Sequence, residues 1–219
     1  MTRRDHSICP VCGLGGNQPK QIPSAVPWKN TPEMEDRTHC DDAWLYECSA
    51  CGSFAITDCD AGDARASERV WTGRSRAQLS ALLREQAIRP LPPYWVQFGL
   101  EPYGPLKLAE LVPIDVDELL AQWPRTVPER LDRMLCNLAR MSETGGFRVE
   151  IRGGDMPLAF AQTPEEELYN ARCLVELGYL DDTDSASEVG RLMLTASGWE
   201  RFEELTQKRN SPAVCNASP

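Results

Sequence analysis

Hydrophobic residues in the C-terminal half of the chain recur every three or four positions, which predicts helices at about 126–144, 164–177 and 196–207. The first two begin at capping boxes, Thr126 to Glu129 and Thr163 to Glu166. Residues 147–151 alternate like a strand, and two short strands at 179–180 and 192–194 flank a polar, acidic loop. The order helix, strand, helix, two-stranded wing and helix is typical of a winged-helix domain. An unspecialised small α+β unit is the alternative.

The N-terminal half has a different pattern. Residues 44–47 and 53–57 are short, aromatic or β-branched runs, which predict the two strands of a hairpin. Four prolines in residues 17–43 predict a loop, and an apolar stripe over 64–89 predicts a helix that the prolines after it end. Residues 90–126 are interpreted as a proline-rich connection with a short helix near 116–122.

Two matched cysteine pairs add chemistry to the predicted hairpin. Cys9 and Cys12, and Cys48 and Cys51, each form a Cys-x-x-Cys-Gly motif. This spacing lets two sulfurs of a tight turn face one tetrahedral ion, and two such turns supply four ligands. The sequence therefore predicts one structural Zn²⁺ per chain in a zinc ribbon. Four thiolates leave no coordination position for water or substrate.

The other cysteines and the histidines lack such a pattern. We interpret two cysteines as possible spare ligands, two as core thiols, one as a free thiol, and both histidines as solvated residues. These are, in that order, Cys40 and Cys59, Cys136 and Cys173, Cys215, and His6 and His39.

Charge is unevenly distributed along this acidic chain, whose net charge is −10. Residues 101–219 carry 12 basic and 21 acidic residues, which disfavours contact with a phosphate backbone. A basic stretch precedes them and is interpreted either as a solvated helix face or as a set of nucleic-acid contacts: Arg65, Arg69, Arg74, Arg76, Arg84 and Arg89. No apolar stretch predicts a signal region or a membrane span, and nine cysteines without a secretion signal predict a reducing cytoplasm.

The predicted fold class is α+β, with an N-terminal zinc ribbon, a helical linker and a C-terminal winged-helix-like domain. The predicted boundaries are 1–62 for the ribbon, 63–125 for the helix and proline-rich connection, 126–207 for the winged-helix-like domain and 208–219 for a flexible tail.

Several segments together carry a resemblance to a known family. They are the motif Cys9 to Gly13, the segment Tyr46 to Gly52, Leu83 to Gln86 before a proline-rich stretch, Pro157 to Ala161, and Leu194 to Arg201. In this combination and order, residues 9–206 resemble the N-terminal region of a largely uncharacterised bacterial family. In that family, a zinc ribbon and a winged-helix-like module precede a nucleoside 2-deoxyribosyltransferase-like or other effector domain, and the proteins are associated with defence against phage.

The resemblance implies a sensing or docking role. The chain reaches Pro219 where the family's enzymatic domain would begin, so no catalytic residue is carried over. No phosphate-binding glycine loop and no histidine occurs in the C-terminal half. We therefore expect a non-enzymatic adaptor that binds an effector, another protein or a second copy of itself. We expect no membrane as a partner. The alternative is a DNA- or RNA-binding regulator that uses the winged helix and the basic stretch.

Overall fold

The two alternating runs on either side of Cys48 form the predicted antiparallel hairpin. The computed structural model describes residues 7–22, 43–57, 73–98, 111–142, 144–151, 156–182 and 190–210. Strand β2 (Ala43–Cys48) pairs with β3 (Gly52–Thr57), with Cys48 opposite Gly52 at the turn. Tyr46 lies opposite Phe54, and their stacked rings are 5.4 Å apart between centroids. Aromatic cross-strand pairs of this kind stabilise a hairpin.

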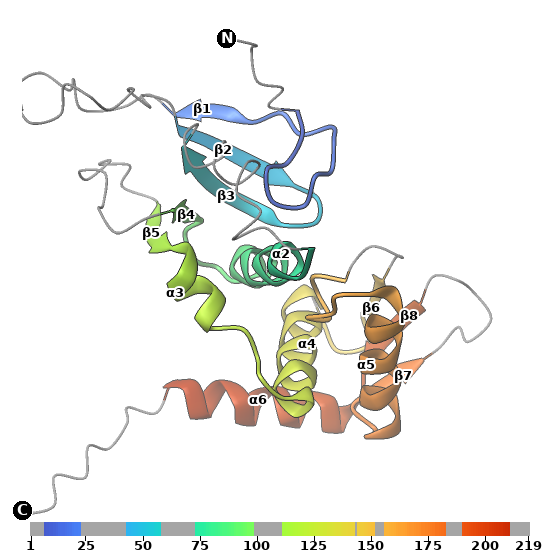
Figure 1. Cartoon of the computed structure of the whole chain (residues 1–219). Coiled ribbons are helices and arrows are strands. Elements are labelled where there is room, and N and C mark those ends of the chain that lie inside the picture. The colour runs from blue at the N-terminus through green and yellow to red at the C-terminus, as the bar shows by residue number, and fades with distance from the viewer. Residues whose placement is uncertain are drawn as a thin grey trace, which may run out of the picture. The chain divides into compact units, whose positions relative to one another are not determined.

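Three further strands extend the hairpin into a five-stranded sheet of order β1-β2-β3-β4-β5 (Figure 1). Strand β1 (Lys20–Ile22) pairs antiparallel with β2. Strands β4 (Tyr94–Gln97) and β5 (Val112–Asp115) add parallel to β3 and to each other. Pro113 is tolerated in β5 because this is an edge strand, where a missing N–H leaves no ladder bond unmade.

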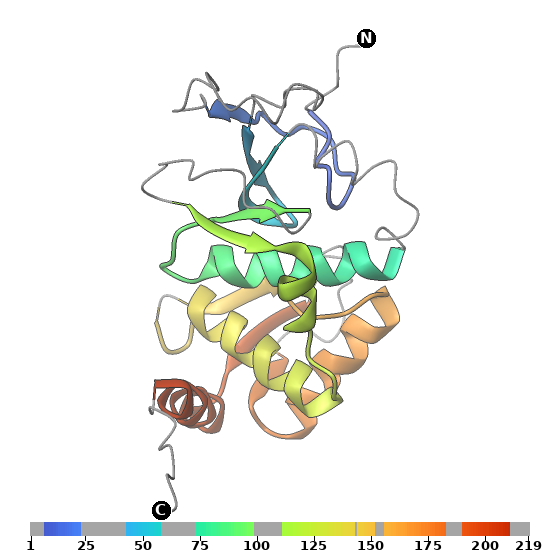
Figure 2. The same cartoon turned by 60° about the vertical axis from the view of Figure 1, so that its left-hand side comes forward.

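Helix α2 (Gly73–Ile88) makes the crossover between the parallel strands β3 and β4. It packs against β3 and against the short helix α3 (Val116–Ala121), and Figure 2 shows it running alongside the strands. Parallel neighbours need such a crossover because a tight turn cannot connect them. A cluster of buried apolar residues forms part of the core of this unit: Ile22, Ala43, Ala55 and Trp95.

The residues after Trp123 form a second compact unit, which begins at Pro124. Its elements are α4 (Val127–Met141), β6 (Arg148–Ile151), α5 (Pro164–Glu176), β7 (Leu180–Asp182), β8 (Gly190–Leu194) and α6 (Ala196–Asn210). The three strands form an antiparallel sheet of order β6-β8-β7. The apolar stripe predicted for α4 is buried in the core of this unit, together with residues of all three strands and of α5.

The two predicted capping boxes form to different extents. At α4, the Thr126 hydroxyl accepts from the Glu129 amide, and the Glu129 carboxylate accepts from the Thr126 amide, so the box is complete. At α5, Thr163 caps the Glu166 amide, but the Glu166 carboxylate accepts from the Gln162 amide and pairs with Arg130. The second half of the box is therefore replaced by a bond from the Gln162 amide to one carboxylate oxygen and an ion pair with Arg130 at the other.

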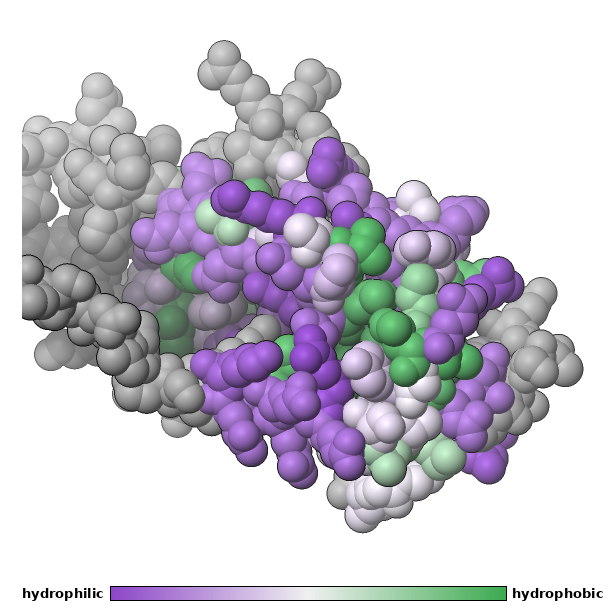
Figure 3. Space-filling model, turned by 90° about the horizontal axis from the view of Figure 1, so that it is seen from below, coloured by the Kyte–Doolittle hydropathy of each residue, from purple (hydrophilic) through white to green (hydrophobic). Residues whose placement is uncertain are grey.

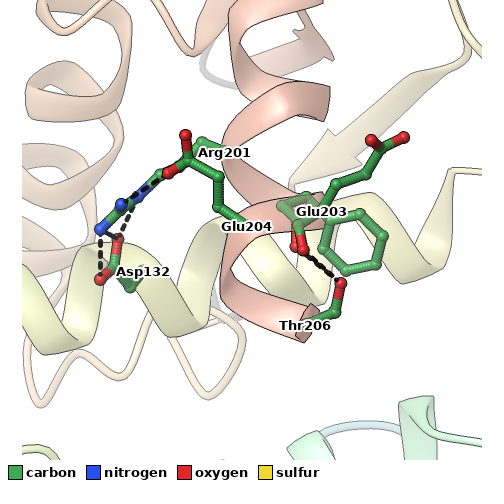
Figure 4. Close-up of polar contacts among 6 residues, drawn as sticks. Asp132, Arg201, Glu203, Glu204 and Thr206 are labelled. Atoms are coloured by element: carbon green, nitrogen blue, oxygen red, sulfur yellow. Dashed lines mark hydrogen bonds and ion pairs between the residues drawn. The ribbon is translucent and has the colours of Figure 1, made fainter. Parts of the chain in front are cut away.

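An ion pair ties α6 to α4 (Figure 4). The Arg201 guanidinium donates to both carboxylate oxygens of Asp132 at 3.0 Å, and also to Glu204 at 3.1 Å. Two-pronged arginine–carboxylate contacts fix direction as well as distance. Gly198 lets the start of α6 approach the backbone of Tyr179 closely, because a Cβ at position 198 would lie 2.1 Å from the Tyr179 carbonyl oxygen.

The structure also differs from the sequence-based expectation. Strands β1, β4 and β5 lie in segments that we interpreted as a loop and a connection. The chain divides into compact units after Trp123, and residues 73–98 and 111–123 belong to the same unit as the hairpin. Among the described residues, no helix has both the length and the apolar character needed to cross a membrane.

Candidate metal centre

The four cysteines predicted to bind metal lie together in the structure. The sulfurs of Cys9 and Cys51 are 3.8 Å apart, those of Cys12 and Cys48 are 3.5 Å apart, and all four lie within 4.8 Å of one another. A tetrahedral ion with Zn–S bonds of about 2.3 Å separates its sulfurs by about 3.8 Å. The cluster therefore has the dimensions of a four-thiolate metal site and can hold one ion.

The first cysteine pair lies in a turn that is closed by its own backbone. The Gly13 amide donates to the Cys9 carbonyl at 3.0 Å, and the Cys9 amide donates to the Leu14 carbonyl at 2.8 Å. Gly13 has a φ of +79°, which an L-residue rarely adopts. Asn17 stabilises the turn, because its side-chain amide donates a hydrogen bond to the Leu14 carbonyl at 2.7 Å.

The second pair lies in the hairpin turn between β2 and β3. Gly52 repeats the left-handed conformation of Gly13, with a φ of +78°. In addition, a Cβ on Gly52 would lie 2.2 Å from the Cβ of Ala87 on α2. The glycine after the second pair is therefore required twice, for the turn and for the close approach of α2.

Backbone amides turn toward a sulfur at both pairs. The amide of Leu14 bonds the Cys12 sulfur, and the amide of Cys51 bonds the Cys48 sulfur. Such bonds lower the pKa of the sulfur that accepts them, because they favour the thiolate. Both turns are thus preorganised to present negative sulfur to a cation.

Helix α2 contributes a further contact to the cluster. The hydroxyl of Ser80, which is buried, lies 3.2 Å from the sulfur of Cys51. A hydroxyl can donate to a thiolate that a metal already binds, which orients the ligand and balances its charge. Ser80 is the residue of this site that the sequence analysis missed. Its signal was a polar position inside the apolar stripe that contains Leu79 and Leu82.

The pKa values of the four cysteine thiols are shifted in different directions. The pKa of Cys51 is raised, first because its hydrogen bond to the Cys12 sulfur favours the protonated form, and further because it is buried. The pKa of Cys48 is lowered, above all because its sulfur accepts a hydrogen bond from Cys12. A divalent cation favours the thiolate at all four positions, so metal binding at this site releases protons.

The remaining predicted residues lie elsewhere or outside the described ranges. Cys136 is buried in α4, and Cys173 is partly buried against the core of the second unit, which fits their interpretation as core thiols. Five of the earlier candidates and two arginines fall outside the described residues: Cys40, Cys59, Cys215, His6, His39, Arg65 and Arg69.

Two arginines of the predicted basic stretch lie on different sides of α2. Arg74 and Arg76 of α2 point about 160° apart, because a helix turns once in 3.6 residues. Arg89 is held by Glu85, with 2.5 Å between nitrogen and oxygen. The structure thus brings the four cysteines together, whereas a nucleic-acid role of the arginines stays a prediction.

Comparisons with known proteins identify no family, so the interpretation of the site rests on its geometry. No family model, no curated protein and no solved structure matches this chain. The class of protein that fold and site define is a mixed α+β protein with a four-cysteine cluster that can bind a metal ion.

Proposed function

We propose that this chain is a non-enzymatic adaptor or sensor. One structural Zn²⁺ holds a zinc ribbon, and a winged-helix-like unit binds a partner protein. The family resemblance makes an effector of a bacterial phage-defence system the first candidate for that partner. The acidic character of α5 is the observation that carries the choice of a protein ligand over a nucleic acid.

Zinc is the metal that this ligand set favours. Thiolates select soft or borderline ions, and a tetrahedral set of four is the usual structural zinc site. The separations of 3.5 and 3.8 Å between sulfurs suit that geometry. Because four cysteines complete the coordination, the ion supports the fold of the hairpin and its neighbours and has no position left for a substrate.

The order of elements after Pro124 supports a winged-helix-like arrangement. Helix α4, strand β6, helix α5 and the pair β7 and β8 follow one another, and β8 lies between β6 and β7 in the sheet. In winged-helix proteins, the helix before the two-stranded wing is the one that enters the major groove. Here α5 occupies that position, so its surface decides which ligand the unit prefers.

The charges of α5 disfavour DNA. The first turn contains Glu165, Glu166 and Glu167, and Arg172 is the only cation of this helix. Specific and non-specific DNA affinity depends largely on lysines and arginines that neutralise phosphates. Glu167 is buried and Glu166 pairs with Arg130, so the exposed Glu165 and Glu176 are the carboxylates that this helix would bring toward the phosphate backbone. A protein partner that brings positive charge fits this surface better.

The test compares protein and DNA as ligands of the full, metal-loaded chain. A photoreactive amino acid replaces Arg172 in the protein expressed in its native host. Illumination should yield a defined crosslinked partner protein, which mass spectrometry identifies. Mobility shifts with duplex DNA at about 150 mM salt should show no sequence-selective complex. Sequence-selective DNA binding that is lost in the variant Arg172→Ala would contradict the proposal and favour the regulator. Turnover of nucleosides or NAD⁺ that one substitution abolishes would contradict the non-enzymatic part.

A further inference from the structure

The three most exposed large hydrophobic side chains of the described residues all belong to α5 and its C-cap. Leu168 is 51% exposed, Tyr169 is 55% exposed and Leu177 is 56% exposed. Figure 3 shows how hydrophobic residues gather on one face of the molecule among hydrophilic ones. An exposed leucine is ordinary by itself, but a group of large apolar side chains on one element marks an interaction site.

Leu168 and Tyr169 share one face of the helix with acidic residues, whereas Leu177 at the C-cap projects about 180° from Leu168. Leu168 and Tyr169 lie one turn after Glu165, and Glu176 lies about two turns after them, so all four project from the same side. The exposed Arg172 lies one turn after Leu168 and Tyr169 and belongs to the same side. The pKa of Tyr169 is raised because its hydroxyl is hydrogen-bonded to Cys173, one turn further on.

The opposite side of α5 is committed to the core of its own unit. Leu174 is 1% exposed, Asn170 donates from its side-chain amide to the Ala159 carbonyl at 3.0 Å, and Glu167 is also buried. The helix is therefore fixed on one side and open on the other. A partner would meet a rigid surface and would not need to fold it.

The charge around the apolar residues defines the chemistry of the partner. Glu165, Glu176 and Asp181 are exposed and outnumber Arg172, the single cation of α5, which lies on the same side of the helix as Leu168 and Tyr169. A second copy of this chain would bring the same negative charge to the contact, and a nucleic acid would bring phosphates. A helix with apolar residues on one side and lysines or arginines beside them complements both features.

We propose that the α5 face, made of Glu165, Leu168, Tyr169, Arg172 and Glu176, binds a cationic amphipathic helix of a partner protein. This inference rests on the proposed function and deepens it, because it assigns the adaptor's docking surface and the chemistry of its partner. Leu168 and Tyr169 provide the apolar contact, and the two glutamates select positive charge and orient the helix.

The experiment uses the full, metal-loaded chain and three synthetic peptides of about 15 residues, the length of a short docking helix. The first peptide has a leucine stripe flanked by lysines, the second has the same stripe flanked by glutamates, and the third has the lysines without the leucines. Fluorescence anisotropy at about 150 mM salt measures affinity, since screening then removes most non-specific attraction. The first peptide should bind saturably and at least about tenfold more tightly than either of the others.

Variants locate the binding and separate its two causes. The pair Leu168→Ser and Tyr169→Ser should weaken the first peptide by at least about tenfold. Phe147→Ser, at another exposed apolar residue of the same unit, is the matched control and should change nothing. The surface pair Glu165→Lys and Glu176→Lys, which removes no apolar contact, should reverse the preference toward the glutamate peptide. Circular dichroism confirms that each variant is folded.

Several results would overturn the α5 face as a docking site. One is equal binding of the first peptide to the double serine variant, and another is equal binding of the peptide without leucines. Dimerisation in sedimentation experiments that the serine pair abolishes would make a second copy the occupant. An identified crosslinked partner that still binds the serine variant would refute this surface while leaving the adaptor function intact. Absence of any protein adduct together with selective DNA binding would refute the proposed function itself.

Discussion

The hydroxyl of Ser80 lies 3.2 Å from the sulfur of Cys51, although 29 residues separate them in the sequence. The contact makes α2 part of the metal centre, since Ser80 is buried in the middle of that helix. Cys51 is itself fully buried, and a hydroxyl beside its sulfur offsets part of the cost of burying a thiolate. The metal site and the crossover helix are thus joined by a polar contact as well as by packing.

Removal of this hydroxyl should weaken metal binding without abolishing it. We expect Ser80→Ala to lower zinc affinity by about 10- to 100-fold, the usual effect of losing a hydrogen bond to a ligand. Competition with a chromophoric chelator measures this directly, and Ser75→Ala on the same helix is the control. In the cobalt-loaded protein, the thiolate-to-metal charge-transfer band should also shift in Ser80→Ala. Unchanged affinity and an unchanged band would show that Ser80 only fills space.

Loss of one ligand should unfold the unit that contains the hairpin and spare the other. The apparent binding energy of structural zinc is about 10–16 kcal/mol at neutral pH, more than a small sheet gains by itself. In Cys48→Ser, amide NMR signals of residues before Trp123 should collapse, while those after Pro124 keep their dispersion. Cys173→Ser should retain one zinc per chain. Well under one zinc in the purified, folded wild-type chain would contradict the site.

The two glycines after the cysteine pairs should respond differently to alanine. Gly13 and Gly52 both have left-handed backbones, which cost an L-residue about 1–2 kcal/mol. Only at Gly52 would the new Cβ also strike Ala87, whereas nothing lies within 4 Å at Gly13. Denaturant unfolding of the zinc-loaded chain should therefore show Gly52→Ala to be less stable than Gly13→Ala by about 1–3 kcal/mol. Adding Ala87→Gly should recover part of that difference, and equal losses at both glycines would argue against the close approach of α2.

The capping box of α4 should make its unit sensitive to acid. The pKa of Glu129 is lowered from 4.5, first because the Arg125 amide donates to its carboxylate and next because the Thr126 amide does. A lowered pKa in the folded state means that this contribution is complete above pH 4.5 and is lost as pH falls through the folded value. The stability difference between wild type and Glu129→Gln should therefore shrink from pH 6 to pH 3.

Urea unfolding followed by amide signals of α4 measures that difference. Thr126→Ala is the informative comparison, because a hydroxyl cap does not titrate and its loss should cost the same at each pH. A difference between wild type and Glu129→Gln that stays constant with pH would show that the carboxylate's charge is irrelevant to the cap.

The sequence by itself determined the local features of this protein. Cys-x-x-Cys-Gly spacing places two sulfurs and a left-handed glycine within one turn, and a threonine three residues before a glutamate caps a helix, whatever the rest of the chain does. For the same reason the β2–β3 hairpin and the start of α4 were predictable, since alternation and helical periodicity act over a few residues, whereas α4 ends at Met141, before the predicted end near 144. The α+β character followed from these elements.

The tertiary structure decided what depends on residues far apart in the chain. Tyr94, Trp95 and Val96 have strand character, but only pairing with β3 shows that they extend the hairpin's sheet. Glu166 pairs with Arg130 of another helix, a contact that the local capping pattern does not indicate, and Ser80 lies beside Cys51 because α2 packs against β3. Which side of α5 remains exposed was likewise set by the core that its other side joins. Such contacts bring distant segments together, which costs chain entropy. The packing of the whole unit offsets that cost, so no short stretch of sequence encodes these contacts.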